Sequence, residues 1–232
     1  MFIGENMDEV ENIYNEGKLL VRAMDFPQLQ RGTDEFEYNC NDWANEFCML
    51  MDGKLTSASS TLIVPSVGVS VYKNIGFLID SDNANCFHIA KSDSGSSGNI
   101  SNGDFHASEP DFNSIIELAN YIKTSGDITM NEVNINASID SVVGLFFNEC
   151  PNQELLLQML YVAKECIKDI TGIDYPIYSY DSINGKLNNI VLTDELVDQI
   201  TKNLKTNKLF YWPDNYDEPV EKEISSSNSH VL

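Results

Sequence analysis

Apolar residues recur every three or four positions along several stretches of the chain, which is the period of an amphipathic α-helix. In residues 41–51, Trp43, Phe47 and Met51 follow one another at intervals of four and form one apolar stripe. In residues 152–170, apolar residues cover more than half of the circumference, which is typical of a core helix. The pattern predicts helices over residues 5–24, 41–51, 112–123 (capped by Asp111), 152–170 and 193–205 (capped by Thr193).

Other segments are rich in Val and Ile and alternate in polarity, which predicts β-strands. The Asn184-Gly185 pair between two such segments predicts a hairpin turn. The predicted strands lie within residues 60–80, 85–91, 128–137, 141–149, 175–192 and 208–212. Runs of strands with helices between them favour an α+β fold with an antiparallel or mixed sheet. We expect a single α+β domain over residues 1–212 and a disordered, acidic and Ser-rich tail over residues 213–232.

The chain is strongly acidic. It has 36 acidic and 14 basic residues, a formal net charge of −22. Such a charge repels nucleic acid and anionic membrane surfaces, and it favours the approach of cationic partners. No stretch reaches the roughly 20 apolar residues of a membrane span, and the N-terminal residues lack the pattern of a signal peptide. We therefore expect a soluble monomer that binds neither nucleic acid nor membrane and needs no cofactor.

The cysteines suggest a reducing compartment. The chain has five cysteines at wide spacings and three histidines, with no CxxC pair, which argues against disulfides and against a structural zinc site. Cys40 is the one cysteine at a predicted helix start, in "YNCNDWANEF". Unpaired N–H groups there lower the pKa of a thiol and favour the nucleophilic thiolate. Alternatively, Cys40 is a small packed residue on the apolar stripe of that helix.

Residues 38–54, "YNCNDWANEFCMLMDGK", resemble the nucleophile helix of the PPPDE peptidases. In that family an Asn-Cys pair opens a helix, an aromatic residue follows three positions later, and Gly-Lys often closes it; Asn39, Cys40 and Trp43 match, as does the Gly-Lys at 53–54. The resemblance implies a permuted papain-like fold and a thiol isopeptidase that acts on ubiquitin-like conjugates. The family's partner histidine precedes its cysteine, whereas no histidine precedes Cys40 here.

A cysteine hydrolase with the histidine after the cysteine, as in papain-like enzymes, remains a candidate. We predict Cys40 as nucleophile, His88 on a strand as general base and Asp104 as the residue that orients it. Asn39 or the backbone N–H of Cys40 would stabilise the oxyanion. A second candidate pair is His106 with Asp111.

An apolar strand ends in Asp80-Ser81-Asp82, which resembles the DxD motif that holds a divalent metal in nucleotide-sugar glycosyltransferases. The same residues are ordinary turn formers between two strands. Asp80 and Asp82 are therefore weak metal candidates.

The tail "DEPVEKEISSSNSHVL" has Glu clusters followed by small polar residues, and it resembles the C-terminal signals of bacterial type IV secretion effectors. This resemblance implies a protein of the bacterial cytoplasm that is translocated into the host cytosol. Together these patterns predict an effector that cleaves or deamidates a host protein, with ubiquitin-like proteins as the first substrate class. The alternative is a non-catalytic acidic binding or inhibitory protein, such as an immunity-type or effector-regulating protein, that masks a basic partner surface.

Overall fold

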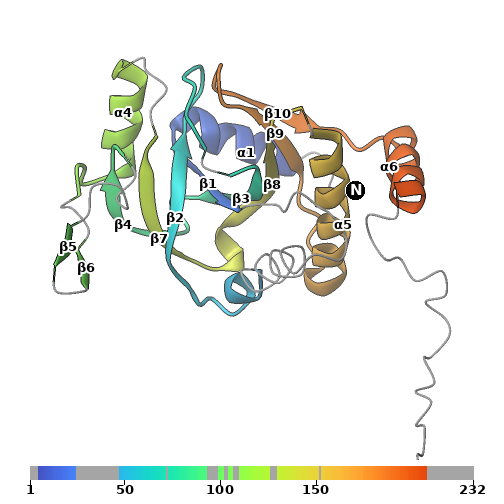
Figure 1. Ribbon diagram of the computed structural model, residues 1–232, viewed down its shortest axis with the longest axis horizontal. Helices are drawn as coiled ribbons and strands as arrows, with labels where there is room; N and C mark the ends of the chain where they lie inside the picture. The colour runs from blue at the N-terminus through green and yellow to red at the C-terminus, as the bar shows by residue number, and fades with distance from the viewer. Residues whose placement is uncertain are drawn as a thin grey trace, which may run out of the picture.

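The computed structural model describes residues 5–24, 47–71, 73–92, 99–101, 104–106, 110–125, 130–151 and 153–207. Within these residues, eight strands form one mixed sheet in the order β10-β9-β8-β3-β1-β2-β7-β4 (Figure 1). All neighbouring strands are antiparallel except β8 and β9, which run parallel. The helix α5 connects this parallel pair, as a crossover connection requires. The α+β fold class and the mixed sheet are as predicted.

The strands of the sheet are β1 (Leu19–Met24), β2 (Leu55–Ile63), β3 (Ile75–Asp80), β4 (Asn85–Ala90), β7 (Glu132–Ala137), β8 (Val142–Asn148), β9 (Ile177–Asp181) and β10 (Lys186–Ile190). A separate hairpin is formed by β5 (Asn99–Ser101) and β6 (Asp104–His106). The helices are α1 (Glu5–Glu16), α4 (Ile115–Ser125), α5 (Gln153–Thr171) and α6 (Asp194–Asn207), with a short 3-10 turn η1 (Ile139–Ser141) and a helical segment at 47–51. Among the described residues, no helix has the length and apolar character that a membrane crossing requires.

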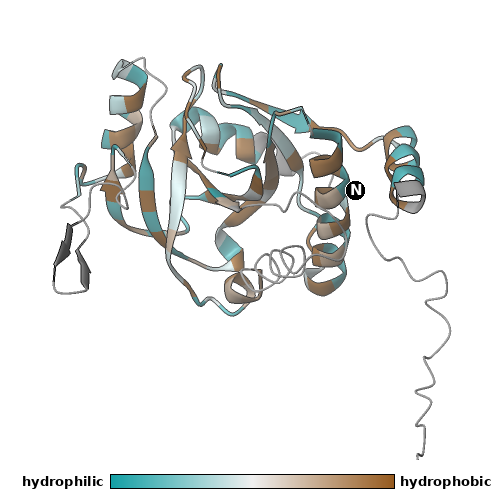
Figure 2. Ribbon diagram, viewed as in Figure 1, coloured by the Kyte–Doolittle hydropathy of each residue, from teal (hydrophilic) through white to brown (hydrophobic). Residues whose placement is uncertain are grey.

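The core lies around the central strands. All residues of β3 are buried, as are Leu19, Leu20 and Val21 of β1. One cluster of buried apolar side chains extends from α1 to β9 and includes residues of α4 and α5. Figure 2 shows the corresponding hydrophobic residues in the central strands and along α5. The predicted helix over 152–170 is confirmed by α5, which packs on β8.

The prediction of one helix over residues 5–24 is wrong in its second half. α1 ends at Glu16, Gly17 takes a left-handed conformation with φ of +76°, and β1 follows. The N–H of Gly17 donates to Tyr14 O and that of Lys18 to Ile13 O, which closes the helix end. β1 pairs on both sides, with β2 and β3, so its apolar run is a fully buried strand rather than a helix face.

The N-cap predicted for the helix after Pro110 is also wrong. Ser114, not Asp111, accepts the hydrogen bond from Glu117 N at 3.2 Å, and the Glu117 carboxylate accepts one from Asn113 N. The carboxylate of Asp111 instead bonds Lys91, through the backbone N at 3.0 Å and the Nζ at 3.3 Å. Asp111 therefore covers the outer edge of β4, whose Ile89 O accepts from the backbone N–H of Asp111.

The hairpin at 175–192 is confirmed by β9 and β10, and the last helix by α6. Thr193 caps α6, since its hydroxyl accepts the N–H of Leu196 at 3.3 Å. The predicted strand at 208–212, the tail at 213–232 and the start of the helix at 41–51 lie outside the described residues.

Candidate functional site

The described residues do not bring the predicted catalytic residues together in one site. Cys40 and Asn39 lie outside them, so the pairing of Cys40 with a histidine stays a prediction. Asp104 and His106 lie on β6, where they pair in register with Ser101 and Asn99 of β5. This hairpin is a sheet of its own, separate from the strand that carries His88.

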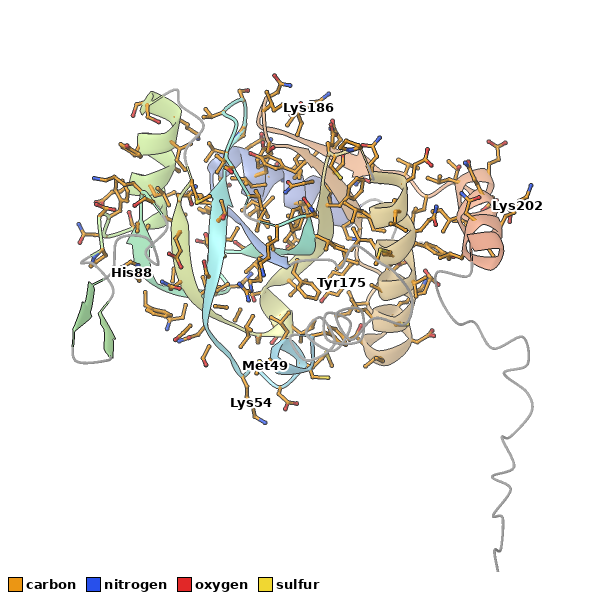
Figure 3. All side chains as sticks on the ribbon, viewed as in Figure 1. Met49, Lys54, His88, Tyr175, Lys186 and Lys202 are labelled. Atoms are coloured by element: carbon orange, nitrogen blue, oxygen red, sulfur yellow. The ribbon has the colours of Figure 1, made fainter. Side chains whose placement is uncertain are left out.

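His88 is a buried residue of β4. It lies opposite Asn134 of β7, next to a bulge that shifts the register between Cys86 and His88. Its side chain is exposed by only 9 %, and its Nδ1 atom is shielded from solvent. Figure 3 shows it at the side of the sheet that carries α4. A general base must come within hydrogen-bond reach of a substrate proton, so this burial favours a packing role for the imidazole.

Two of the described thiols are poor nucleophiles. Burial raises the pKa of Cys86 to about 11, and the carboxylates of Asp82 and Asp80 add to the effect. Cys166 is exposed on α5, and partial desolvation together with the carboxylates of Asp169 and Glu165 raises its pKa. Since the thiolate is the reactive form, neither residue resembles a catalytic cysteine.

The Asp80-Ser81-Asp82 segment forms the turn between β3 and β4. The Asp80 carboxylate accepts hydrogen bonds from Asp82 N at 3.0 Å and from Asn83 Nδ2 at 2.7 Å. The Asp82 carboxylate pairs with Lys18 Nζ at 2.9 Å. Both carboxylates thus have partners within the protein, and the residues that the structure describes contain no group of three His, Cys, Asp or Glu side chains that could hold a metal.

A different feature joins three parts of the chain that are far apart in sequence. The loop after β2 and the turn between β9 and β10 lie side by side, next to α1 (Figure 1). We call residues 66–68 together with residues 182–185 the loop tip. Tyr14 of α1 donates its hydroxyl to Gly185 O at 2.8 Å and to Val64 O at 3.2 Å, and Ser66 N donates to Gly185 O at 2.9 Å.

Two glycines let the backbones of the loop tip approach closely. A Cβ atom at Gly185 would lie 2.2 Å from Val67 O, and one at Gly68 would lie 2.3 Å from Ile183 O. Gly185 also has a left-handed φ of +58°, which glycine adopts without strain. The two loops therefore fit together only with glycine at both positions.

The Asp181 side chain fixes the turn from inside. Its Oδ1 accepts hydrogen bonds from the N–H groups of Ile183 at 2.9 Å and Asn184 at 3.1 Å, and its Oδ2 accepts one from Asn184 Nδ2. The bonds from Asn184 hold the pKa of Asp181 below its usual value. These contacts make the turn rigid. The Asn184-Gly185 signal predicted the turn, but no sequence pattern indicates that Tyr14 and Gly68 complete it.

No protein-family model and no curated protein sequence matches the chain. Function must therefore be inferred from the residues themselves.

Several cations of the described residues are held by carboxylates of the same chain. Lys18 lies between Glu16 and Asp82, at 2.8 and 2.9 Å. Other ion pairs join Lys54 to Asp52, Lys91 to Asp111, and both Lys164 and Lys168 to Asp174. These pairs leave an excess of exposed carboxylates, and α1 carries two of them, Glu9 and Glu11.

The helix α1 differs from the other helices in its charge. It contains acidic residues and no lysine or arginine, whereas α4, α5 and α6 each include at least one lysine. No ion pair joins Glu9 or Glu11 to a cation of the described residues. Both lie beyond the first turn, so the helix dipole gives little reason for a negative charge there.

Proposed function

We propose that the protein is a non-catalytic binding protein that engages a basic partner through an acidic surface, with α1 as part of that surface. The observation that carries the proposal is the polar face of α1, a helix without lysine or arginine whose exposed Glu9 and Glu11 are not neutralised by described cations. A large excess of negative charge destabilises the folded chain through self-repulsion, which a cationic partner would relieve.

The net charge of −22 supports the same proposal. Complementary charge raises association rates by roughly 10- to 1,000-fold at low salt and mainly determines which partners meet. A protein that masks a basic surface benefits from this effect without any reacting group. The partner class is therefore a protein or peptide with a dense cluster of Lys and Arg.

The buried state of His88 also favours binding over hydrolysis. A histidine with 9 % exposure on β4 is poorly accessible to a protein substrate. The raised pKa of Cys86 makes this thiol a poor nucleophile, and the pKa of Cys166 is also raised. The cysteine hydrolase built on Cys40 remains the rival prediction.

The proposal is tested by titrating the protein with an oligolysine peptide over a range of KCl concentrations. Glu9→Gln with Glu11→Gln removes two charges from α1, and Glu154→Gln with Asp169→Asn removes two exposed charges from α5 as a matched control. We expect salt-sensitive binding that the α1 pair weakens several-fold more than the α5 pair, because local contacts add to the overall field. Equal effects of the two pairs would reduce the binding to non-specific attraction and refute the proposal.

A further inference from the structure

The loop tip carries an exposed apolar side chain. Ile183 is 73 % exposed, more than any other large hydrophobic residue that the structure describes. Its neighbours in the tip are small or uncharged, such as Ser66, Ser182 and Asn184. In an acidic protein this is an uncharged area with an apolar centre. Protein interfaces have that composition in their core, where charged residues are depleted.

The rigidity of the tip makes Ile183 suitable as an anchor. The backbone N–H of Ile183 is fixed by Asp181, and its carbonyl lies against Gly68. A side chain on a rigid turn loses little conformational freedom when a partner covers it, so more of the burial energy remains for binding. The side chain itself lies outside the core, because most of it is in solvent.

Charged groups lie directly beside this uncharged area. α1 reaches the tip through the hydrogen bond of Tyr14 with Gly185. Glu11 is close enough to β9 to contribute to the raised pKa of Tyr178, whose main cause is burial. One cation, Lys186, also lies at this end of the molecule (Figure 3), and it helps to lower the pKa of Asp181. Glu11 precedes Tyr14 by three positions in α1, so the helix carries acidic charge within about one turn of its contact with the tip.

We propose that the loop tip is the centre of the docking surface, and that Ile183 inserts into an apolar patch rimmed by cations on a basic protein partner. This inference rests on the proposed function and adds to it the anchor and its position. The partner's cations would face α1, while its apolar patch would cover Ile183. Removing the anchor should weaken binding about tenfold, as expected for the burial of one large aliphatic side chain.

The test uses an amphipathic helical peptide of Lys and Leu, whose Leu stripe between Lys residues stands in for the partner surface. Its affinity is measured for the wild type, for Ile183→Ser, and for Val191→Ser as a matched control. Val191 is 65 % exposed and follows the other end of β10. Backbone amide shifts in NMR spectra locate the bound peptide. Both substitutions replace exposed residues, so thermal unfolding should be unchanged.

We expect shifts in residues 66–68, 182–186 and α1, with about tenfold weaker binding for Ile183→Ser and less than a twofold change for Val191→Ser. Equal effects of the two substitutions, or shifts confined to other elements, would overturn the docking site. If binding is still salt-sensitive and depends on Glu9 and Glu11, the proposed function survives that outcome. If the peptide does not bind at low salt, both proposals fail together.

Discussion

Substitution of Gly185 by Ala tests whether the loop tip is locked by backbone contact. Alanine in the left-handed region costs about 1–2 kcal/mol. The new Cβ would lie 2.2 Å from Val67 O and would force the turn away from the neighbouring loop. That movement breaks the hydrogen bonds that Gly185 O accepts from Tyr14 and Ser66, which contribute about 1 kcal/mol each. We expect the free energy of unfolding to fall by about 3–4 kcal/mol.

The control is Gly172→Ala, at the end of α5. Gly172 also has a left-handed φ, of +74°, but nothing lies within 4 Å of an added Cβ. The free energy of unfolding of this variant should fall only by the cost of placing alanine in the left-handed region, about 1–2 kcal/mol. Urea unfolding followed by circular dichroism gives both values. Equal losses in the two variants would show that the close approach of the loops contributes nothing to stability and that backbone contact does not lock the loop tip.

Other substitutions test single interactions. Tyr14→Phe should lower the free energy of unfolding by about 1–2 kcal/mol in urea unfolding, because it removes the hydroxyl that bonds Gly185 O; an unchanged value would contradict this role. Because the pKa of Asp181 is lowered, its contribution to stability is present above pH ~4 and is lost as the pH falls further. The unfolding midpoint of Asp181→Asn should therefore decline less steeply in acid than that of the wild type. Parallel declines of the two proteins would argue against this role of Asp181. Asn131→Ala should lower the free energy of unfolding by about 2–4 kcal/mol, since the buried side-chain amide forms hydrogen bonds with both the N–H and the C=O of Leu62. A loss below about 1 kcal/mol would mean that water replaces the side chain.

Much of the fold follows from local patterns. α4, α5, α6 and the β9–β10 hairpin were predicted because each has a complete signal, an apolar period or a turn pair. The failure at residues 5–24 has a physical cause. A short apolar run such as Leu19-Leu20-Val21 fits a buried strand as well as a helix. Only the pairing of this segment with β2 and β3 on its two sides makes it a strand. The cap of α4 shows a similar limit, because Asp111 and Ser114 are both good capping residues.

The loop tip could not be predicted, because it depends on contacts across long sequence separations. Tyr14 and Gly185 are 171 positions apart, yet one hydrogen bond joins them. The close packing of Gly68 against the β9–β10 turn likewise follows only from the fold. In the same way, the burial of His88 results from its position on β4, whereas the sequence showed only a histidine on a strand.

The rate of alkylation of Cys40 by iodoacetamide, mapped by mass spectrometry at neutral pH, tests most directly whether the protein binds or catalyses. Cys48 is exposed and gives the internal reference in the same sample. A non-catalytic binding protein predicts that Cys40 reacts no faster than Cys48. A Cys40 that reacts at least about tenfold faster would indicate a thiolate with a lowered pKa, and it would contradict the proposed function in favour of a cysteine hydrolase.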